Sequence, residues 1–259
     1  MEITIPLISP LSRKYYEYAS DDLEKIHHRA EDVRICLEKV CDSLIIQLVN
    51  STTKDNWETY KLHQKILACK DFMDCTIVDG LLAAKVVGNK GVHEGEEGTF
   101  TAQDIDKSLD AIKTFSLEIF YSYFVKYGFD GYPRHAWVPT VFSTLPPVYR
   151  VEILTKYYSV NPSLFVIDKL AMALLKSGFK EKADSFLVEC YNKQQIDKYN
   201  LDGLMDKLNL LEKALPQVNV ANTLEESKKN FLKLLPAIEE EKQNMFIYLV
   251  SMVLTDETP

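Results

Sequence analysis

The stretch DDLEKIHHRAEDVRICLEKVCDSLIIQLV, residues 21–49, decides the fold class of the first half of the chain. Its apolar side chains recur at steps of three and four residues, at Leu23, Ile26, Ala30, Val33, Leu37, Val40, Leu44 and Leu48. This spacing places them on one face and predicts a single long amphipathic helix over residues 21–49. Ser20 is expected to cap this helix, with Asp21 and Asp22 in the first turn, where the helix dipole favours negative charge.

Most of the remaining chain also carries helical patterns. A short extended arm is expected before residue 21, and a polar loop at residues 50–56. Thr101 and Asp104 have the spacing of a capping box at the start of a helix. An alternating β pattern is confined to residues 3–8, so the sequence predicts an all-α protein. The expected helices span about 58–70, 76–87, 102–127, 147–158, 162–177, 180–193, 198–214, 223–235 and 237–254.

A change of composition marks the expected domain boundary. Residues 128–150, GFDGYPRHAWVPTVFSTLPPVYR, contain two glycines and four prolines, which interrupt regular elements. Their aromatic side chains indicate a packed connector, because a flexible linker lacks them. The sequence therefore predicts an N-terminal helical domain over 1–130, a connector over 131–150 and a C-terminal helical interaction domain over 151–259.

The stretch KLAMALLKSGFKEKADSFLVECY, residues 169–191, has the pattern of a helical hairpin of the tetratricopeptide kind. Ala173, Gly178 and Ala183 stand where small residues let two helices approach, and Gly178 is expected to end the first helix. No clear second copy follows at a period near 34 residues. An irregular helical bundle is therefore the plainer interpretation of the second half.

Composition limits the function classes. The net charge is −8, and residues 1–130 hold 15 basic against 22 acidic side chains, which disfavours an extensive nucleic-acid-binding surface. The sequence has no long uncharged apolar run and no secretory signal at its start, so neither membrane association nor secretion is expected. The five cysteines lack zinc-ligand spacing. We expect reduced thiols in a cytoplasmic protein, with no metal and no cofactor.

Three of the candidate functional side chains lie in one stretch, KVVGNKGVHEGEEG, residues 85–98. If a helix runs through it, Lys85, Asn89 and His93 recur every four residues and share one face. Gly88 and Gly91 would each cost about 1 kcal/mol relative to alanine in a helix interior. Either close helix packing or a break that directs His93 into a cleft should compensate.

Two motifs give the first half a family resemblance. VRICLEKVCD, residues 33–42, followed by KVVGNKGVHE, residues 85–94, resembles the branch of the HEPN superfamily (higher eukaryotes and prokaryotes nucleotide-binding domain) with R-x3-E and G-N-x3-H motifs. The resemblance covers about residues 14–127. It implies an up-and-down helical bundle that dimerises, and a setting in prokaryotic defence. It also implies metal-independent ribonuclease activity in many members.

In such ribonucleases an arginine, a polar residue and a histidine form the active site. The resemblance implies that His93 is the motif histidine and Asn89 the polar residue, whereas Gly88 stands in place of the arginine. Lys85 or Arg34 is then the candidate cation on the phosphate. If Arg34 and Glu38 of the first helix face His93, they complete a candidate polar cluster with Lys85 and Asn89, which would indicate a ligand site. The opposing interpretation is structural: Arg34 and Glu38 form an i,i+4 ion pair, and Asn89 and His93 satisfy buried helix ends or pair with Glu38, holding the bundle together.

Three functions follow from these residues. The leading hypothesis is a non-catalytic or weakly catalytic interaction module of a prokaryotic defence or stress system, with a protein partner and a homodimeric state. The alternative is a defence ribonuclease that uses His93 as acid or base, with RNA as substrate. A third hypothesis is a nucleotide-binding sensor. The aromatic run FSLEIFYSYFVKYGF, residues 115–129, is expected to form core, with part of it available for a dimer interface.

Overall fold

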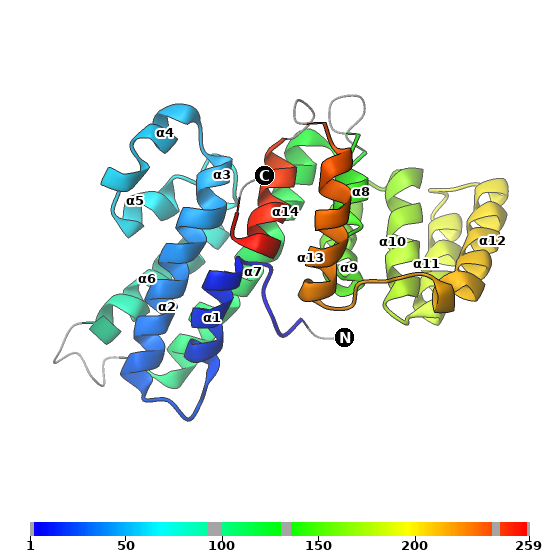
Figure 1. Ribbon diagram of the computed structural model, residues 1–259. Helices are drawn as coiled ribbons and strands as arrows, with labels where there is room; N and C mark the ends of the chain where they lie inside the picture. The colour runs from blue at the N-terminus through cyan, green and yellow to red at the C-terminus, as the bar shows by residue number, and fades with distance from the viewer. Residues whose placement is uncertain (1–2, 93–99, 131–135, 240–243, 258–259) are drawn as a thin grey trace. The chain divides into compact units, whose positions relative to one another are not determined.

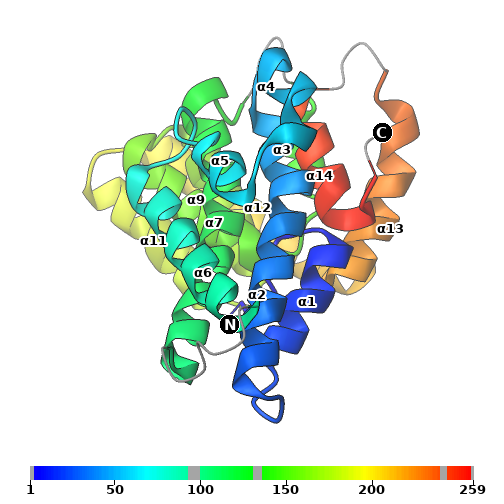
Figure 2. The same cartoon turned by 90° about the vertical axis from the view of Figure 1, so that its left-hand side faces the viewer.

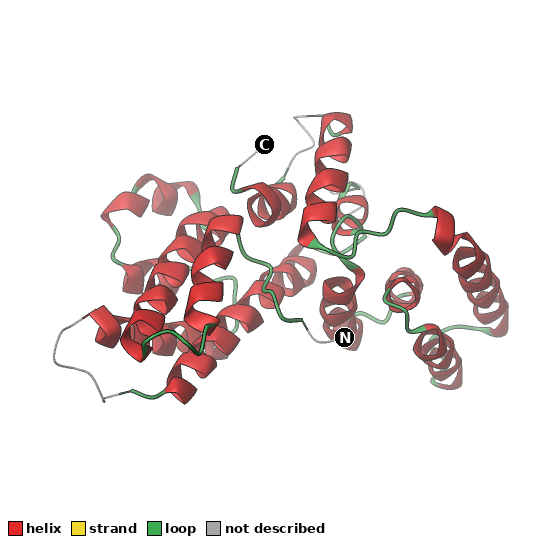
Figure 3. Ribbon diagram, turned by 60° about the horizontal axis from the view of Figure 1, so that its bottom comes forward, coloured by secondary structure: helices red, strands yellow, loops and turns green. Residues whose placement is uncertain are grey.

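The computed structural model describes residues 3–92, 100–130, 136–239 and 244–257. Helices make up its regular structure, and the described residues contain no strand (Figure 3), which confirms the all-α prediction. The chain folds into two compact units. We call residues 4–122 with 243–259 the N-terminal unit, and residues 1–3 with 123–242 the C-terminal unit.

The N-terminal unit is built around helix α2 (Ile26–Val40), which packs between α1 (Pro10–Ser20) and α6 (Cys75–Val92), as Figures 1 and 2 show. A π-helical turn η1 (Cys41–Ile45) and a short helix α3 (Ile46–Leu48) continue α2. The other elements of the first 122 residues are α4 (Ser51–Asp55), η2 (Trp57–Thr59), α5 (Leu62–Leu67) and most of α7 (Ala102–Tyr127). The long helix predicted over 21–49 therefore begins at Ile26 and contains a π-helical turn.

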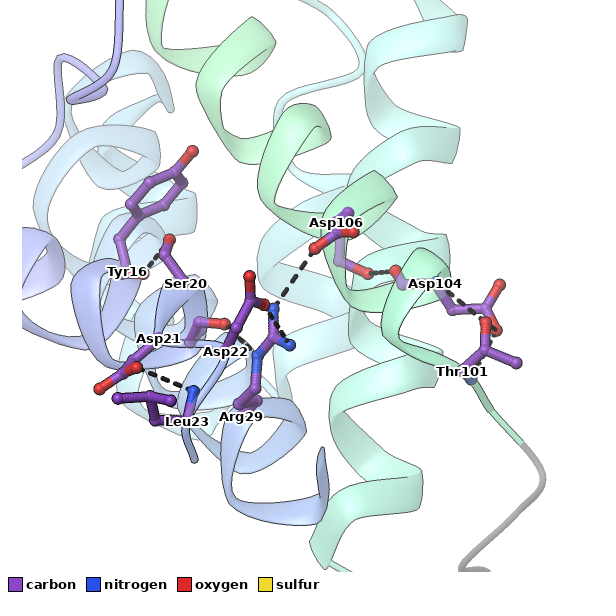
Figure 4. Close-up of polar contacts among 11 residues, drawn as sticks. Tyr16, Ser20, Asp21, Asp22, Leu23, Arg29, Thr101, Asp104 and Asp106 are labelled. Carbon is purple, nitrogen blue, oxygen red and sulfur yellow. Dashed lines mark hydrogen bonds and ion pairs between the residues drawn. The ribbon is translucent and has the colours of Figure 1, made fainter. Parts of the chain in front are cut away.

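The beginning of the chain differs from the prediction. Helix α1 occupies part of the expected extended arm, because Ser9 accepts a hydrogen bond from the Ser12 amide and Pro10 suits the first helical position. Ser20 belongs to the last turn of α1 and donates to the Tyr16 carbonyl, so it does not cap α2. The Asp21 carboxylate accepts from the Leu23 amide at 2.9 Å, and this Asx-type turn separates the two helices (Figure 4).

The last helix belongs to the N-terminal unit. Helix α14 (Met245–Thr255), expected as part of a C-terminal domain, packs against α1, η1 and α3 in the N-terminal unit. Its sequence is apolar around nearly its whole circumference, and a helix of this kind must be buried on all sides. Its side chains with at most 1% exposure are Phe246, Ile247, Leu249, Val250, Val253 and Leu254. The division into units thus places residues 243–259 with the first half of the chain, unlike the predicted boundary.

The C-terminal unit consists of helical hairpins. Its helices are α8 (Val138–Phe142), α9 (Pro147–Val160), α10 (Leu164–Lys176), α11 (Lys180–Asn192), α12 (Lys198–Ala214) and α13 (Leu224–Leu234), with 3-10 turns η3 (Leu215–Gln217) and η4 (Leu235–Ala237). Gly178 has φ of 83° and ends α10, as predicted. The α10–α11 hairpin is therefore confirmed.

Each unit has its own apolar core. In the C-terminal unit α10, α11 and α12 share a core that includes Ile167, Leu187 and Leu208. The aromatic run predicted near residue 120 fills cores: Phe115, Phe120, Tyr123 and Phe124 are fully buried, and Phe129 is 2% exposed. These side chains therefore belong to the core, whereas Val125 and Tyr127 of the same run are 55% and 37% exposed, and the dimer interface stays a prediction.

Candidate functional site

The α2–α6 pair positions the residues that the sequence singled out. Helix α6 runs through residues 85–92, and it lies antiparallel to α2 because Gly88 faces Arg34 while Gly91 faces Ala30. A β-carbon at Gly88 would lie 2.7 Å from the Arg34 Cβ and 3.0 Å from its backbone nitrogen. A β-carbon at Gly91 would lie 2.7 Å from the Ala30 Cβ. Close helix packing is therefore what compensates for glycine in this helix.

Arg34, Glu38 and Asn89 come together as a cluster. The Arg34 Nε donates to Glu38 Oε1 at 3.1 Å, and its Nη2 lies 3.0 Å from the same oxygen. The Arg34 Nη1 donates to Asn89 Oδ1. The side chains of Arg34 and Glu38 are 31% and 40% exposed, so solvent screens the ion pair and limits it to a few tenths of a kcal/mol.

The other two predicted site residues are not part of this cluster. Lys85 is half-buried one turn before Asn89, and it makes no hydrogen bond or ion pair with the described residues. His93 lies outside the described residues. The structure therefore unites three of the five predicted side chains.

A pocket of about 340 Å³ adjoins Arg34. We call it the Arg34 pocket; it is lined by Arg34, Glu38, Asp42, Tyr60, Lys61, Leu62 and Lys65. The Lys65 Nζ donates to Asp42 Oδ1 at 2.6 Å, and the Trp57 indole donates to the same oxygen at 2.8 Å. Arg34 and Lys65 thus already face carboxylates, and a phosphate group would have to displace Glu38 from Arg34.

Arg29 is a buried charged residue that the sequence patterns did not identify. Its side chain, 5% exposed, ties three elements together: Nε donates to the Ala19 carbonyl of α1 at 2.8 Å, Nη1 lies 2.8 Å from Asp22, and Nη2 lies 3.3 Å from Asp106 of α7 (Figure 4). A carbonyl in the last helical turn needs an external donor, which the guanidinium supplies. We therefore assign Arg29 a structural role.

Arg29 shows what sequence spacing misses. Its partners lie 10 and 77 residues away, so no i,i+4 pattern links them. Its place between Ile26 and Ala30 on the apolar side of the predicted helix was the available signal.

The cysteines do not form a reactive centre in the described residues. Cys36, Cys41, Cys69 and Cys190 are buried, and Cys75 is exposed; all are free thiols. Burial raises the pKa of the Cys36 and Cys41 thiols, and it raises the pKa of Cys69 to about 11. A raised thiol pKa disfavours the nucleophilic thiolate. No group of potential metal ligands gathers in the described ranges.

A larger groove of about 720 Å³ lies in the C-terminal unit, between α10 and α12. We call it the α10–α12 groove; it is lined by Leu164, Phe165, Asp168, Tyr199, Asn200, Asp202, Gly203, Leu204, Asp206 and Lys207. Tyr199 is 85% exposed, and Leu164 is 43% exposed. The groove thus combines exposed apolar side chains with carboxylates. Sequence spacing does not reveal this groove, because its residues come from two helices about 40 positions apart.

Within the part of the chain that the structure describes, no helix has both the length and the apolar content that crossing a membrane requires. Comparison of the chain with protein-family models, curated proteins and solved structures finds no match. The resemblance to the HEPN superfamily therefore rests on the two short motifs in residues 33–42 and 85–94.

Proposed function

We propose that this protein is a non-catalytic interaction module whose C-terminal unit binds a partner protein in the α10–α12 groove. The observation that carries this proposal is the groove itself, because it exposes Tyr199 and Leu164 beside a volume that a side chain of a partner can occupy. Exposed tyrosine and apolar side chains in a concave surface are characteristic of sites where proteins bind partners.

Gly203 supports the same assignment. It lies within α12, where glycine costs about 1 kcal/mol relative to alanine. A β-carbon there would meet no atom within 4 Å, so packing inside the protein does not require glycine. Because Gly203 lines the groove, the absence of a side chain leaves room for a partner to approach the α12 backbone.

The charges of the groove indicate the kind of partner. Asp168, Asp202 and Asp206 line it together with Lys207, which is paired with Asp168 at 2.6 Å, and Asp202 is paired with Lys198 at 2.7 Å. Among the described residues Asp206 makes no ion pair, and its carboxylate favours a partner segment with a basic residue beside an apolar face. A basic amphipathic helix has that chemistry.

The resemblance of the first half to the HEPN superfamily extends the proposal to the fold, the oligomeric state and the biological system of the protein. It suggests a HEPN-like arrangement for the N-terminal unit and a homodimeric protein in a prokaryotic defence or stress system. The α10–α11 hairpin suggests a tetratricopeptide-like arrangement for the C-terminal unit. Sedimentation velocity at micromolar concentration tests the dimer, and a purely monomeric species would remove it.

Peptide selection tests the groove. A library of helical peptides is selected against the full chain, and binders are measured on Tyr199→Ala, Gly203→Met and the control Leu232→Ala, an exposed residue on α13. The proposal expects basic amphipathic binders whose affinity falls at least tenfold in the two groove variants and stays unchanged in the control. Binders that the groove variants do not affect would contradict it.

A ribonuclease is the second candidate, and the Arg34 pocket is the observation that favours it, because Lys61 and Lys65 lie there with Arg34. In that case His93 acts as acid or base, Asn89 orients the substrate, and Arg34 or Lys85 contacts the phosphate. Arg34 and Lys65, however, already pair with Glu38 and Asp42. We therefore place this candidate, and a nucleotide sensor using the same residues, behind the interaction module.

A further inference from the structure

An arginine of the C-terminal unit has a buried nitrogen that makes no hydrogen bond with the described residues. Arg150, in the first turns of α9, is 6% exposed, and its Nε is inaccessible to solvent and makes no hydrogen bond. Burial lowers its pKa to about 10, so the guanidinium still carries its charge at neutral pH. A buried charge without a counter-ion is strongly unfavourable, and proteins normally pair it.

Two lysines of the neighbouring helix add to this positive charge. Helix α10 packs against α9 and carries Lys169 and Lys176, which are two turns apart and therefore on the same side. Because α9 and α10 pack together as a hairpin joined by residues 161–163, Arg150 near the start of α9 lies at the same end of the hairpin as Lys176 at the end of α10. Burial lowers the pKa of Lys176, and the charges of Arg150 and Lys169 lower it further.

Carboxylates do not neutralise this cluster within the described part of the chain. Lys176, like Arg150, makes no ion pair there. The Lys169 Nζ is 3.9 Å from Asp168, but Asp168 is held more closely by Lys207, at 2.6 Å. The cluster therefore has an excess of positive charge that an anion from outside the chain would neutralise.

We propose that Arg150 and Lys176, with Lys169 beside them, bind a phosphoryl group. A phosphate dianion neutralises more of the cluster than a carboxylate does, and its oxygens match the fork of a guanidinium. Inorganic phosphate and the phosphate of a nucleotide offer the same chemistry. This site belongs to the C-terminal unit, whereas the Arg34 pocket belongs to the N-terminal unit, and the proposal does not depend on the proposed partner groove.

Thermal unfolding of the full chain tests the site. The melting temperature is measured at constant ionic strength in phosphate-free buffer, and then with inorganic phosphate, sulfate or adenosine monophosphate. The variants are Arg150→Met, Lys176→Met and the control Lys233→Met, an exposed lysine on α13. Phosphate tenfold above its dissociation constant is expected to raise the melting temperature of the wild type by about 3 to 6 °C.

The site is supported if both cluster variants lose this rise and the control retains it. An equal rise with phosphate and with the nucleotide assigns the site to a phosphoryl group alone, whereas a larger rise with the nucleotide assigns it to the nucleotide. The absence of any rise in the wild type, or a rise that persists in Arg150→Met or Lys176→Met, would overturn the proposal.

Discussion

Gly88 and Arg34 show at the residue scale how much of the candidate site the sequence could predict. The spacing of Arg34 and Glu38, and the position of Asn89 on a glycine-containing helix, were sufficient to predict a polar cluster, and these three side chains do meet. The spacing could not show that Gly88 presses against the backbone of Arg34, because the approach of two helices is a tertiary property. The close approach to Arg34 leaves no room for a side chain at Gly88, the position where the resemblance implies an arginine.

Alanine at the two helical glycines should have opposite effects. Gly88→Ala places a β-carbon 2.7 Å from the Arg34 Cβ and should lower the free energy of unfolding by about 1 to 3 kcal/mol. Gly203→Ala meets no atom within 4 Å and should raise it by about 0.4 to 1 kcal/mol. Urea denaturation monitored by circular dichroism measures both. Equal effects at the two positions would contradict the close approach of α2 and α6.

The contacts of Arg29 also allow a prediction about the stability of the protein. Arg29→Met leaves the Ala19 carbonyl without its donor and should lower the free energy of unfolding by about 1 to 3 kcal/mol. Asp106→Asn serves as the control, and it should change stability by less than about 1 kcal/mol, since Asp106 is 63% exposed. Thermal denaturation distinguishes the two variants. A larger loss in Asp106→Asn would place the main contribution of Arg29 in that ion pair.

At the scale of elements, local sequence signals predicted most of the helices. Packing contacts between segments far apart in the sequence were not predicted. Helix α7 has the predicted limits, and its Thr101–Asp104 capping box is present: the Thr101 amide donates to Asp104 Oδ2 at 2.8 Å. Helix α1 was not predicted, although its start signal, Ser9–Pro10, is local. The burial of α14 in the N-terminal unit depends on contacts across almost the whole chain, which periodicity does not encode.

The α7 cap predicts a pH dependence. Hydrogen bonds from the side chain and backbone of Thr101 lower the pKa of Asp104 below its ordinary value of 3.8. A lowered pKa means that this stabilisation is fully present well above pH 3.8 and is lost as the pH falls through the folded-state pKa. Asp104→Asn should therefore lower the melting temperature at pH 6 and have a smaller effect near pH 2. The same decrease at both pH values would show that the carboxylate charge of Asp104 does not stabilise the helix.

At the scale of the whole molecule, the chain leaves the N-terminal unit at residue 122 and returns to it at residue 243. Phe246 of α14 is fully buried and makes an edge-to-face contact with Phe120 of α7, with ring centroids 5.8 Å apart. The sequence placed a boundary where prolines gather, but the return of the last helix has no local signal. The integrity of the first half thus depends on residues near the end of the chain.

This dependence can be measured in the full chain. Phe246→Ala should lower the free energy of unfolding of the N-terminal unit by about 3 to 5 kcal/mol. Hydrogen exchange followed by mass spectrometry should show faster exchange in peptides of α2 and in the first half of α7, and unchanged exchange in α10 and α11. Faster exchange confined to peptides from residues 123–242 would show that α14 belongs with the second half.

The central claim, that this protein acts by binding a partner and not by cleaving RNA, has one most direct test. RNA cleavage is measured with a chelator present from pH 5.5 to 8.5, with the wild type and His93→Ala compared at equal concentration and both shown to be folded. We predict signals for the two proteins that equal a protein-free control, because Arg34 is held by Glu38 and Asn89 and Gly88 offers no guanidinium. Cleavage by the wild type that His93→Ala abolishes would contradict the claim.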